Sequence, residues 1–109
     1  MLLRFIGTSH GRPEPDRRTS CTMVEINGSL YFIDMGTEVI GDIRKYGFEP
    51  PDVRMVACTH PHGDHTDGIV QFVETCGYFY KDAAAKVILP NPQMPGLLRA
   101  WIDACCEND

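Results

Sequence analysis

The residues most able to do chemistry lie in one segment, residues 59–68, which reads THPHGDHTDG. This segment holds three of the chain's four histidines within six residues. His60 and His62 are two positions apart, so both imidazoles project to the same side of an extended segment. Gly63 allows the chain to turn back, which brings the next polar side chains toward the same point. The spacing predicts a metal site with the ligands His60, His62, Asp64 and His65.

The donor types in this segment narrow the choice of metal. Imidazole and carboxylate together suit zinc, iron or manganese better than calcium or magnesium. The alternative interpretation is a histidine-rich turn that arises by chance and stays solvated. Four donors in a tight turn between a strand and a helix favour the metal site.

The elements on either side of the segment would position it. Residues 53–59 (VRMVACT) predict a strand that is largely apolar on both faces, which indicates a central position with cover on both sides. A helix is expected to begin at Thr66 and to stop at Gly77, with its apolar residues on one face. The donors would then lie at the carboxyl end of a strand, just before a helix.

The rest of the chain predicts a mixed α/β layer. Asn27-Gly28 lies between two β-rich runs and favours a type I′ hairpin, because both turn positions need positive φ. A further helix is expected from a cap at Thr37 to a stop at Gly47. The chain is completed by strands at residues 2–6 and 86–89, a polar loop at 8–20, and a last helix with the apolar stripe Leu97, Leu98, Trp101, Ile102 and Cys105. The order is then strand, hairpin, helix, strand, helix, strand, helix.

The sequence also resembles a known family. The pattern HxHxDH over residues 60–65 resembles the signature of the metallo-β-lactamase superfamily of metallohydrolases. Upstream, residues 5–8 (FIGT) and 20–22 (SCT) resemble that fold's first two strands, and residues 31–36 (YFIDMG) resemble its third strand, which ends in Asp-x-Gly. The opening loop most resembles the ribonuclease-Z-like and phosphodiesterase-like branches. The resemblance implies an α/β fold that is half of an αββα sandwich, a mixed β-sheet with helices packed on one face, in a single truncated domain over residues 1–109.

The resemblance further implies roles for the donors. In the superfamily, two metals share a bridging hydroxide that attacks the carbonyl or phosphorus of the substrate. Carried over by position, His60 and His62 bind the first metal, while Asp64, the catalytic residue, and His65 bind the second. Zinc is expected at both positions, with iron or manganese as alternatives. Asp34 resembles a carboxylate that fixes a ligand histidine, and the alternative is a buried structural Asp bonded to backbone.

This ligand set is half of the one that the superfamily uses. The family takes two further histidines and a bridging aspartate from its second half, and no histidine follows His65 here. His10, in the first loop, is the only other histidine, and a solvated side chain is the alternative to a ligand there. Each metal would receive two ligands from this chain, whereas catalytic zinc usually has three.

An apolar sheet face without cover would mark an interface. Three explanations stay open for the half-built site and sheet. The chain is a fragment of a longer hydrolase that lacks its C-terminal half, a homodimer whose second copy covers the sheet, or a short form without catalysis.

Composition bounds the class of protein. The 109 residues are 43% hydrophobic with a formal net charge of −5, which fits one small domain and does not support bulk electrostatic binding of nucleic acid. No apolar run approaches the roughly 20 residues that span a bilayer, so no membrane partner is expected. The five cysteines form no CxxC pair, and Cys105-Cys106 has no ligand spacing. Reduced thiols and a cytoplasmic protein are therefore expected.

Two weaker candidates stand outside the histidine segment. Arg12, Arg17 and Arg18 cluster in the first loop, where they contact an anionic phosphate or simply form a solvated loop with acidic neighbours. Cys58 forms a nucleophilic pair with His60 or is a buried structural thiol, and the second interpretation is favoured.

Together these features predict a metal-dependent hydrolase of the metallo-β-lactamase fold, with this chain inactive or incomplete when alone. Its substrate would be a small molecule or a phosphodiester, cleaved at a phosphodiester or other ester-type bond. The rival hypothesis is a non-catalytic metal-binding or interaction module that dimerises, or binds a partner, through its open sheet.

Overall fold

Five strands form one mixed sheet in the computed structural model, which describes residues 1–105. The sheet order follows the chain: β1 (Leu2–Gly7), β2 (Cys21–Ile26), β3 (Ser29–Met35), β4 (Val53–Ala57) and β5 (Lys86–Ile88). The first three strands pair antiparallel, and β3, β4 and β5 pair parallel. The predicted order of elements is confirmed, including the hairpin at Asn27-Gly28, where φ is 50° and 80°.

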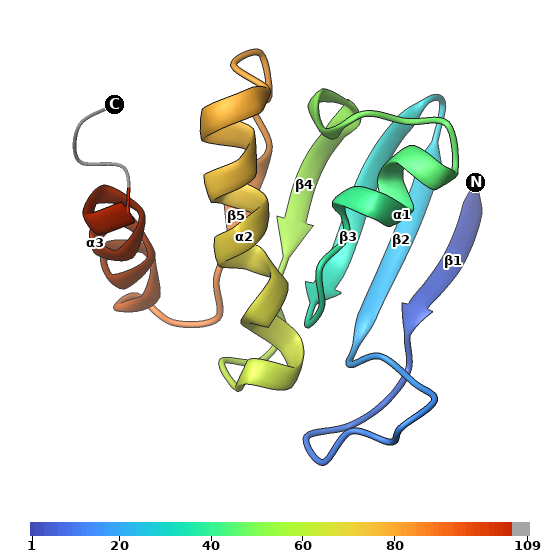
Figure 1. The fold of residues 1–109 in the computed structure, drawn as a ribbon, viewed down its shortest axis with the longest axis horizontal. Coiled ribbons are helices and arrows are strands. Elements are labelled where there is room, and N and C mark those ends of the chain that lie inside the picture. The colour runs from blue at the N-terminus through green and yellow to red at the C-terminus, as the bar shows by residue number, and fades with distance from the viewer. Residues whose placement is uncertain (106–109) are drawn as a thin grey trace.

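Helices lie on one side of this sheet. Figure 1 shows α1 (Ile40–Lys45) and α2 (Gly63–Phe79) on the same side, and α3 (Met94–Cys105) beyond α2. A short 3-10 turn, η1 (Pro50–Asp52), leads into β4. The cross-strand row Met23, Phe32, Val56 and Val87 faces these helices, and its first three side chains are fully buried. The predicted mixed sheet with helices on one face is what the structure shows.

The opposite face of the sheet has no cover among the described residues. Phe5, Thr22, Ile33, Ala57 and Ile88 form one continuous cross-strand row on this face. Phe5, Ile33 and Ile88 in this row are exposed large hydrophobic residues. The prediction that β4 is covered on both faces is therefore wrong for residues 1–105, although β4 does lie between two other strands.

Both predicted helix starts are displaced. Thr37 does not cap α1: the cap is Val39, and the Thr37 hydroxyl instead accepts a hydrogen bond from Arg18 Nε at 3.2 Å. The second helix begins at Gly63, three residues before Thr66, with His62 as its cap. Thr66 cannot serve as a cap there, because its hydroxyl donates back to the His62 carbonyl at 3.1 Å, one turn earlier.

The second helix ends later than expected, and the third helix is only partly covered. The second helix runs through Gly77 to Phe79, since the Tyr80 N–H still donates to the Cys76 carbonyl at 3.0 Å. The third helix has no fully buried residue, but Leu98 of its apolar stripe is partly buried and packs against the core. Cys106, paired above with Cys105, lies outside the described residues. None of the described helices is long and apolar enough to span a membrane.

Candidate metal centre

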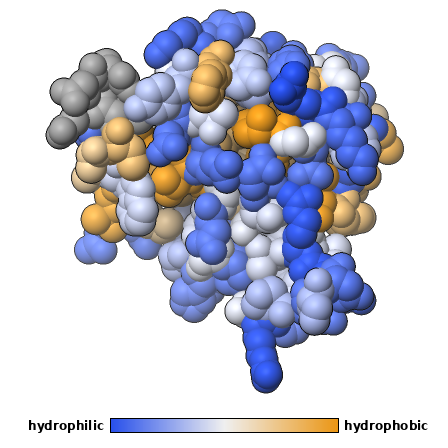
Figure 2. Space-filling view, in the orientation of Figure 1, coloured by the Kyte–Doolittle hydropathy of each residue, from blue (hydrophilic) through white to orange (hydrophobic). Residues whose placement is uncertain are grey.

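The predicted donors gather at one end of the sheet. The strands β3 and β4 finish there, α2 begins there, and Figure 1 shows the loop between β1 and β2 at the same end. In the same orientation, Figure 2 shows this end of the molecule as mostly hydrophilic. The donors therefore lie at the carboxyl edge of the two parallel strands, where the chain turns into a helix.

Asp34 is the organising residue of this end. It sits near the end of β3 with φ of 59°, in the left-handed region that Asp and Asn tolerate better than most residues. Its carboxylate is buried and accepts hydrogen bonds from the Thr59 backbone N–H at 2.7 Å and the Thr59 hydroxyl at 2.8 and 2.9 Å. It also lies 2.7 Å from His65 Nδ1. Asp34 thus joins the end of β3 to the segment after β4 and to the first turn of α2.

The electrostatics of Asp34 follow from these contacts. Burial alone would raise the pKa of this carboxyl. The hydrogen bonds from the Thr59 N–H, from His65 and from the Thr59 hydroxyl outweigh burial and leave the pKa of Asp34 below its ordinary value. A carboxylate that stays ionised is the acceptor that a ring N–H of His65 needs.

Asp64 and His65 form the first pair of donors. With Nδ1 of His65 facing Asp34, the other ring nitrogen, Nε2, lies 3.3 Å from Asp64 Oδ2. When Nδ1 carries the proton, Nε2 offers a lone pair, so two electron-pair donors converge. Two ligands that share a tetrahedral zinc ion at about 2.1 Å stand roughly 3.4 Å apart. The pair therefore fits a metal ion with little movement.

His60 and His62 form the second pair. Nε2 of His60 lies 2.8 Å from Nδ1 of His62, and the two rings meet edge to face. This separation is that of a hydrogen bond, so one of the two nitrogens donates its N–H to the other. Both side chains are exposed, and this hydrogen bond must break so that both nitrogens present a lone pair before they can hold a cation together. The expectation that the two imidazoles project to the same side agrees with their contact.

Neither pair gains a third ligand within residues 1–105. No group of three or more His, Cys, Asp or Glu side chains in that part of the chain is arranged to hold a metal ion. His10 joins neither pair: its Nδ1 accepts the Arg12 backbone N–H at 3.3 Å, and its Nε2 lies 3.8 Å from Glu14. The donor chemistry fits divalent zinc, iron or manganese, and each pair supplies half of a coordination shell.

Cys58 contacts the backbone of the donor segment. Its buried thiol donates to the carbonyl of His60 at 3.0 Å and lies 3.8 Å from the carbonyl of His65. Burial raises the pKa of this thiol, so it stays protonated as a donor. The sulfur therefore contacts backbone and not the His60 imidazole, which supports the structural interpretation of Cys58 over the nucleophilic one.

Thr59 is the residue that sequence reasoning missed. Both its N–H and its hydroxyl hold Asp34, as described above. No local pattern indicates this role, because Thr59 and Asp34 lie 25 positions apart in the chain. Its role depends on the pairing of β3 with β4, which a sequence alone does not state.

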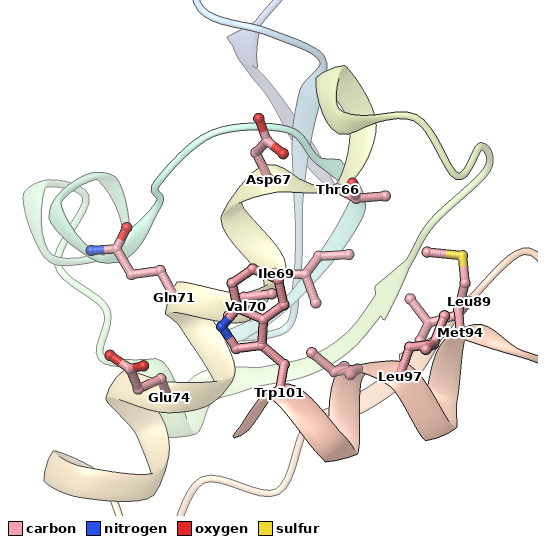
Figure 3. Close-up of a pocket in the computed structure, with 11 residues that line it drawn as sticks. Thr66, Asp67, Ile69, Val70, Gln71, Glu74, Leu89, Met94, Leu97 and Trp101 are labelled. Carbon is pink, nitrogen blue, oxygen red and sulfur yellow. The ribbon is translucent and has the colours of Figure 1, made fainter. Parts of the chain in front are cut away.

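An apolar groove lies on another side of α2. It encloses about 580 Å³ between α2 and α3 and includes Thr66 and Asp67, which directly follow the donors, but none of the four donors themselves. Figure 3 shows Trp101 reaching from α3 toward α2, with Glu74 and Gln71 on the facing helix. The groove carries no histidine or cysteine, so it is not the centre of the proposed chemistry.

Comparison with known proteins identifies the family. The family model described as Anti-Pycsar protein Apyc1 matches residues 1–108. The chain belongs to this family. Its relatives include a ribonuclease Z from Clostridium botulinum (strain Eklund 17B / Type B), which is 33% identical to this chain over 88 residues. The matched residues cover 81% of this chain and 28% of that protein.

Solved structures agree on the fold of this Apyc1 family member. Human tRNase Z, short form, superposes with a TM-score of 0.76 at 19% identity, over 98% of this chain and 41% of that chain. The metallo-β-lactamase fold protein YhfI from Bacillus subtilis gives 0.63 at 18% identity, over 78% and 35%. The predicted resemblance to the metallo-β-lactamase fold and to the ribonuclease Z branch is confirmed. The chain spans less than a third of the length of the ribonuclease Z that it matches.

Proposed function

We propose that this chain carries half of a two-metal centre that hydrolyses a phosphodiester bond. The observation that supports the proposal most directly is the line Asp34, His65 and Asp64, in which a buried carboxylate faces one ring nitrogen and leaves the other beside a second carboxylate. A histidine that only filled space would not need both nitrogens matched in this way.

The chain's own residues have separate tasks in this proposal. His60 and His62 would hold one divalent cation, and Asp64 and His65 would hold the other, with zinc as the preferred metal. Bound divalent cations lower the pKa of water and neutralise the charge that develops on the substrate. Asp34 fixes the orientation and tautomer of His65 (2.7 Å), and Thr59 fixes Asp34.

The substrate class follows from the family and the charge of the chain. Membership of the Apyc1 family and similarity to proteins named ribonuclease Z support a phosphodiester over a carboxylic ester. A formal net charge of −5 supports a small diester over a long polyanion, because a polyanion would be repelled by the bulk of the chain.

A second candidate is a metal-binding or interaction module without catalysis. Two observations favour it: each donor pair supplies only two ligands within residues 1–105, and one sheet face is apolar and open there. In this alternative, a second copy or another partner covers the sheet, and metal binding serves assembly.

The test begins with the metal content of the purified 109-residue chain, by elemental analysis after dialysis against zinc. Hydrolysis of bis(p-nitrophenyl) phosphate is then measured over a range of protein concentrations, with and without a chelator. We expect zinc-dependent hydrolysis that the chelator removes and that His62→Ala lowers by about a hundredfold. His10→Ala is the matched control, because that exposed histidine joins neither donor pair.

The outcomes separate the two candidates. Bound zinc with hydrolysis that depends on His62 supports the enzyme. Bound zinc that depends on His62 without hydrolysis at any concentration supports the module. A chain that retains no zinc, or hydrolysis that His62→Ala leaves unchanged, contradicts the assignment of these donors.

A further inference from the structure

The loop between β1 and β2, residues 8–20, is held firmly at its base. The Ser9 N–H donates to the Arg18 carbonyl at 2.8 Å, and the Thr19 hydroxyl donates to the Gly36 carbonyl at 2.6 Å. Gly7 permits this closure, because a Cβ at that position would lie 1.7 Å from the Thr19 carbonyl oxygen. The rest of the loop is therefore carried at a fixed place relative to the end of β3.

This loop reaches the donor pairs. A Cβ on Gly11 would lie 3.8 Å from the Asp64 carboxylate, which places the Gly11 backbone directly beside a proposed metal ligand. The next Cα along the chain, that of Arg12, is about 3.8 Å further on. A side chain as long as arginine spans more than that, so a guanidinium at position 12 is within reach of a substrate held at Asp64.

The three arginines of the loop differ in what they contact. Arg18 is fully engaged: its guanidinium donates to both oxygens of Asp42, at 3.0 and 2.8 Å, and to the Thr37 hydroxyl at 3.2 Å. Arg17 lies 3.7 Å from Glu14. Arg12 is exposed, and its side chain has no recorded hydrogen bond or ion pair with any residue from 1 to 105. Arg12 is thus the arginine of the loop whose guanidinium is available to an anion.

Acidic groups near the donors make a cationic side chain at the rim useful for binding an anionic substrate. The two carboxylates of Asp34 and Asp64 lie within 2.7 and 3.3 Å of His65, and the chain as a whole is acidic. Divalent cations on the donors would offset these two carboxylates, but an anionic phosphodiester still approaches a chain whose formal net charge is −5. A guanidinium at the rim offsets the repulsion and makes paired, charge-assisted hydrogen bonds to phosphate oxygens, which a neutral ester cannot accept as strongly.

We propose that Arg12, carried beside Asp64 by the loop 8–20, contacts the phosphate of the substrate and selects anionic diesters over neutral esters. This inference rests on the proposed function, and it deepens it by naming the residue that sets the charge of the substrate. Of the other two arginines, Arg18 forms an ion pair with Asp42, and Arg17 lies close to Glu14 within the loop.

The test compares Arg12→Ala, Arg12→Lys and the control Arg17→Ala in the zinc-loaded chain. Arg17 is the matched control because it is an exposed arginine of the same loop with an acidic partner of its own. The substrates are bis(p-nitrophenyl) phosphate, which is anionic, and p-nitrophenyl acetate, which is neutral. Binding of dimethyl phosphate, followed by calorimetry, gives a second measurement that does not depend on turnover.

We expect Arg12→Ala to lower kcat/KM for the anionic diester by about ten- to a hundredfold, mostly through KM, the range for a lost charge-assisted contact. The neutral ester should change by less than about twofold, because no charge is recognised there. Dimethyl phosphate should bind about tenfold more weakly or worse. Arg12→Lys should recover part of both losses, since lysine keeps the charge but not the paired geometry.

The outcomes also separate this inference from the proposed function. If the wild-type chain hydrolyses the diester and Arg12→Ala equals Arg17→Ala, the role of Arg12 is wrong and the proposed function stands. If the wild-type chain shows no hydrolysis but binds dimethyl phosphate through Arg12, the anion site stands and the proposed function fails. Equal losses for the charged and neutral substrates, or a wild-type chain that neither hydrolyses nor binds the phosphate probe, overturn the role of Arg12.

Discussion

At the scale of single residues, Asp34 decides how well the site is organised. Its backbone has a left-handed φ of 59°, and its carboxylate contacts Thr59 and His65. A non-glycine residue in this region carries a conformational cost, and Asp and Asn meet that cost best because of their short polar side chains. An aspartate at this position therefore tolerates the backbone conformation and also supplies the carboxylate that orients His65.

This reasoning predicts the effect of Asp34→Asn. Asparagine tolerates the same backbone conformation, so the fold should survive, but it removes the negative charge that holds the Nδ1 proton of His65. Zinc should bind about ten- to a hundredfold more weakly. The dissociation constant is measured by competition with a chromophoric chelator. Asp82→Asn, at an exposed position far along the chain, is the control and should change nothing. A zinc affinity within twofold of the wild type would show that Asp34 is only structural.

Most residues of the site could be predicted from the sequence, and one could not. The types and spacing of His60, His62, Asp64 and His65 are local, so the sequence predicted two pairs that the structure does bring into contact. Asp34 could be proposed from its strand end, by resemblance. Thr59 could not, because its hydrogen bonds cross between strands that lie about 25 residues apart in the chain.

At the scale of elements, the start of α2 sets the positions of the donors. The helix begins at Gly63, so Asp64 and His65 lie in its first turn and not in a preceding loop. Consecutive residues in a helix point in directions about 100° apart, which lets Asp64 face the loop at Gly11 while His65 faces Asp34. The sequence placed this start three residues too late, because Thr66 has the type of a cap but bonds back into the helix instead.

The same helix depends on one close approach to the rest of the fold. A Cβ on Gly68 would lie 1.9 Å from the Thr37 carbonyl oxygen and 3.0 Å from that of Met35, both backbone atoms. Glycine at this position lets α2 pack directly on the segment that follows β3, the strand that carries Asp34. The approach therefore fixes the distance between the helix donors and their supporting carboxylate.

Two alanine substitutions in α2 test this packing. Gly68→Ala should destabilise the fold by about 2 kcal/mol or more, because backbone atoms must move to admit the methyl group. Gly77→Ala, in the same helix but with no atom from outside its own helical turns within 4 Å of its Cβ position, should stabilise the fold by up to about 1 kcal/mol, because the added methyl group meets open space. Urea denaturation followed by circular dichroism gives both free energies of unfolding. Equal effects of the two substitutions would mean that helix propensity, and not close packing, governs Gly68.

At the scale of the whole molecule, one face of the sheet is covered by helices and the other face is exposed in residues 1–105. The row under the helices is buried, while the row from Phe5 to Ile88 on the other face exposes three large apolar side chains. Sequence patterning correctly predicted the strands and their order, because alternation and turn residues are local signals. It could not predict which face stays open, since cover depends on what packs there and the strands look apolar on either face.

From this open face we predict that the 109-residue chain associates with a second copy of itself. Large contiguous apolar patches mark interfaces, and two such faces bury each other's exposed side chains. Each phenylalanine removed from water contributes about 1.5 to 3 kcal/mol, so Phe5→Lys should raise the dissociation constant of a dimer by at least about tenfold. Sedimentation velocity over a range of concentrations should show the wild-type mass rising while that of the variant stays monomeric.

The control for this prediction is another exposed phenylalanine. Phe79, at the end of α2, is 77% exposed against 68% for Phe5, but it lies on the helix and not on the open row of the sheet. If general stickiness of exposed aromatic side chains drove association, Phe79→Lys would disperse the chain as well as Phe5→Lys does. If the sheet face drives it, only Phe5→Lys disperses the chain. A wild-type chain that stays monomeric at every concentration would show that a second copy does not cover this face.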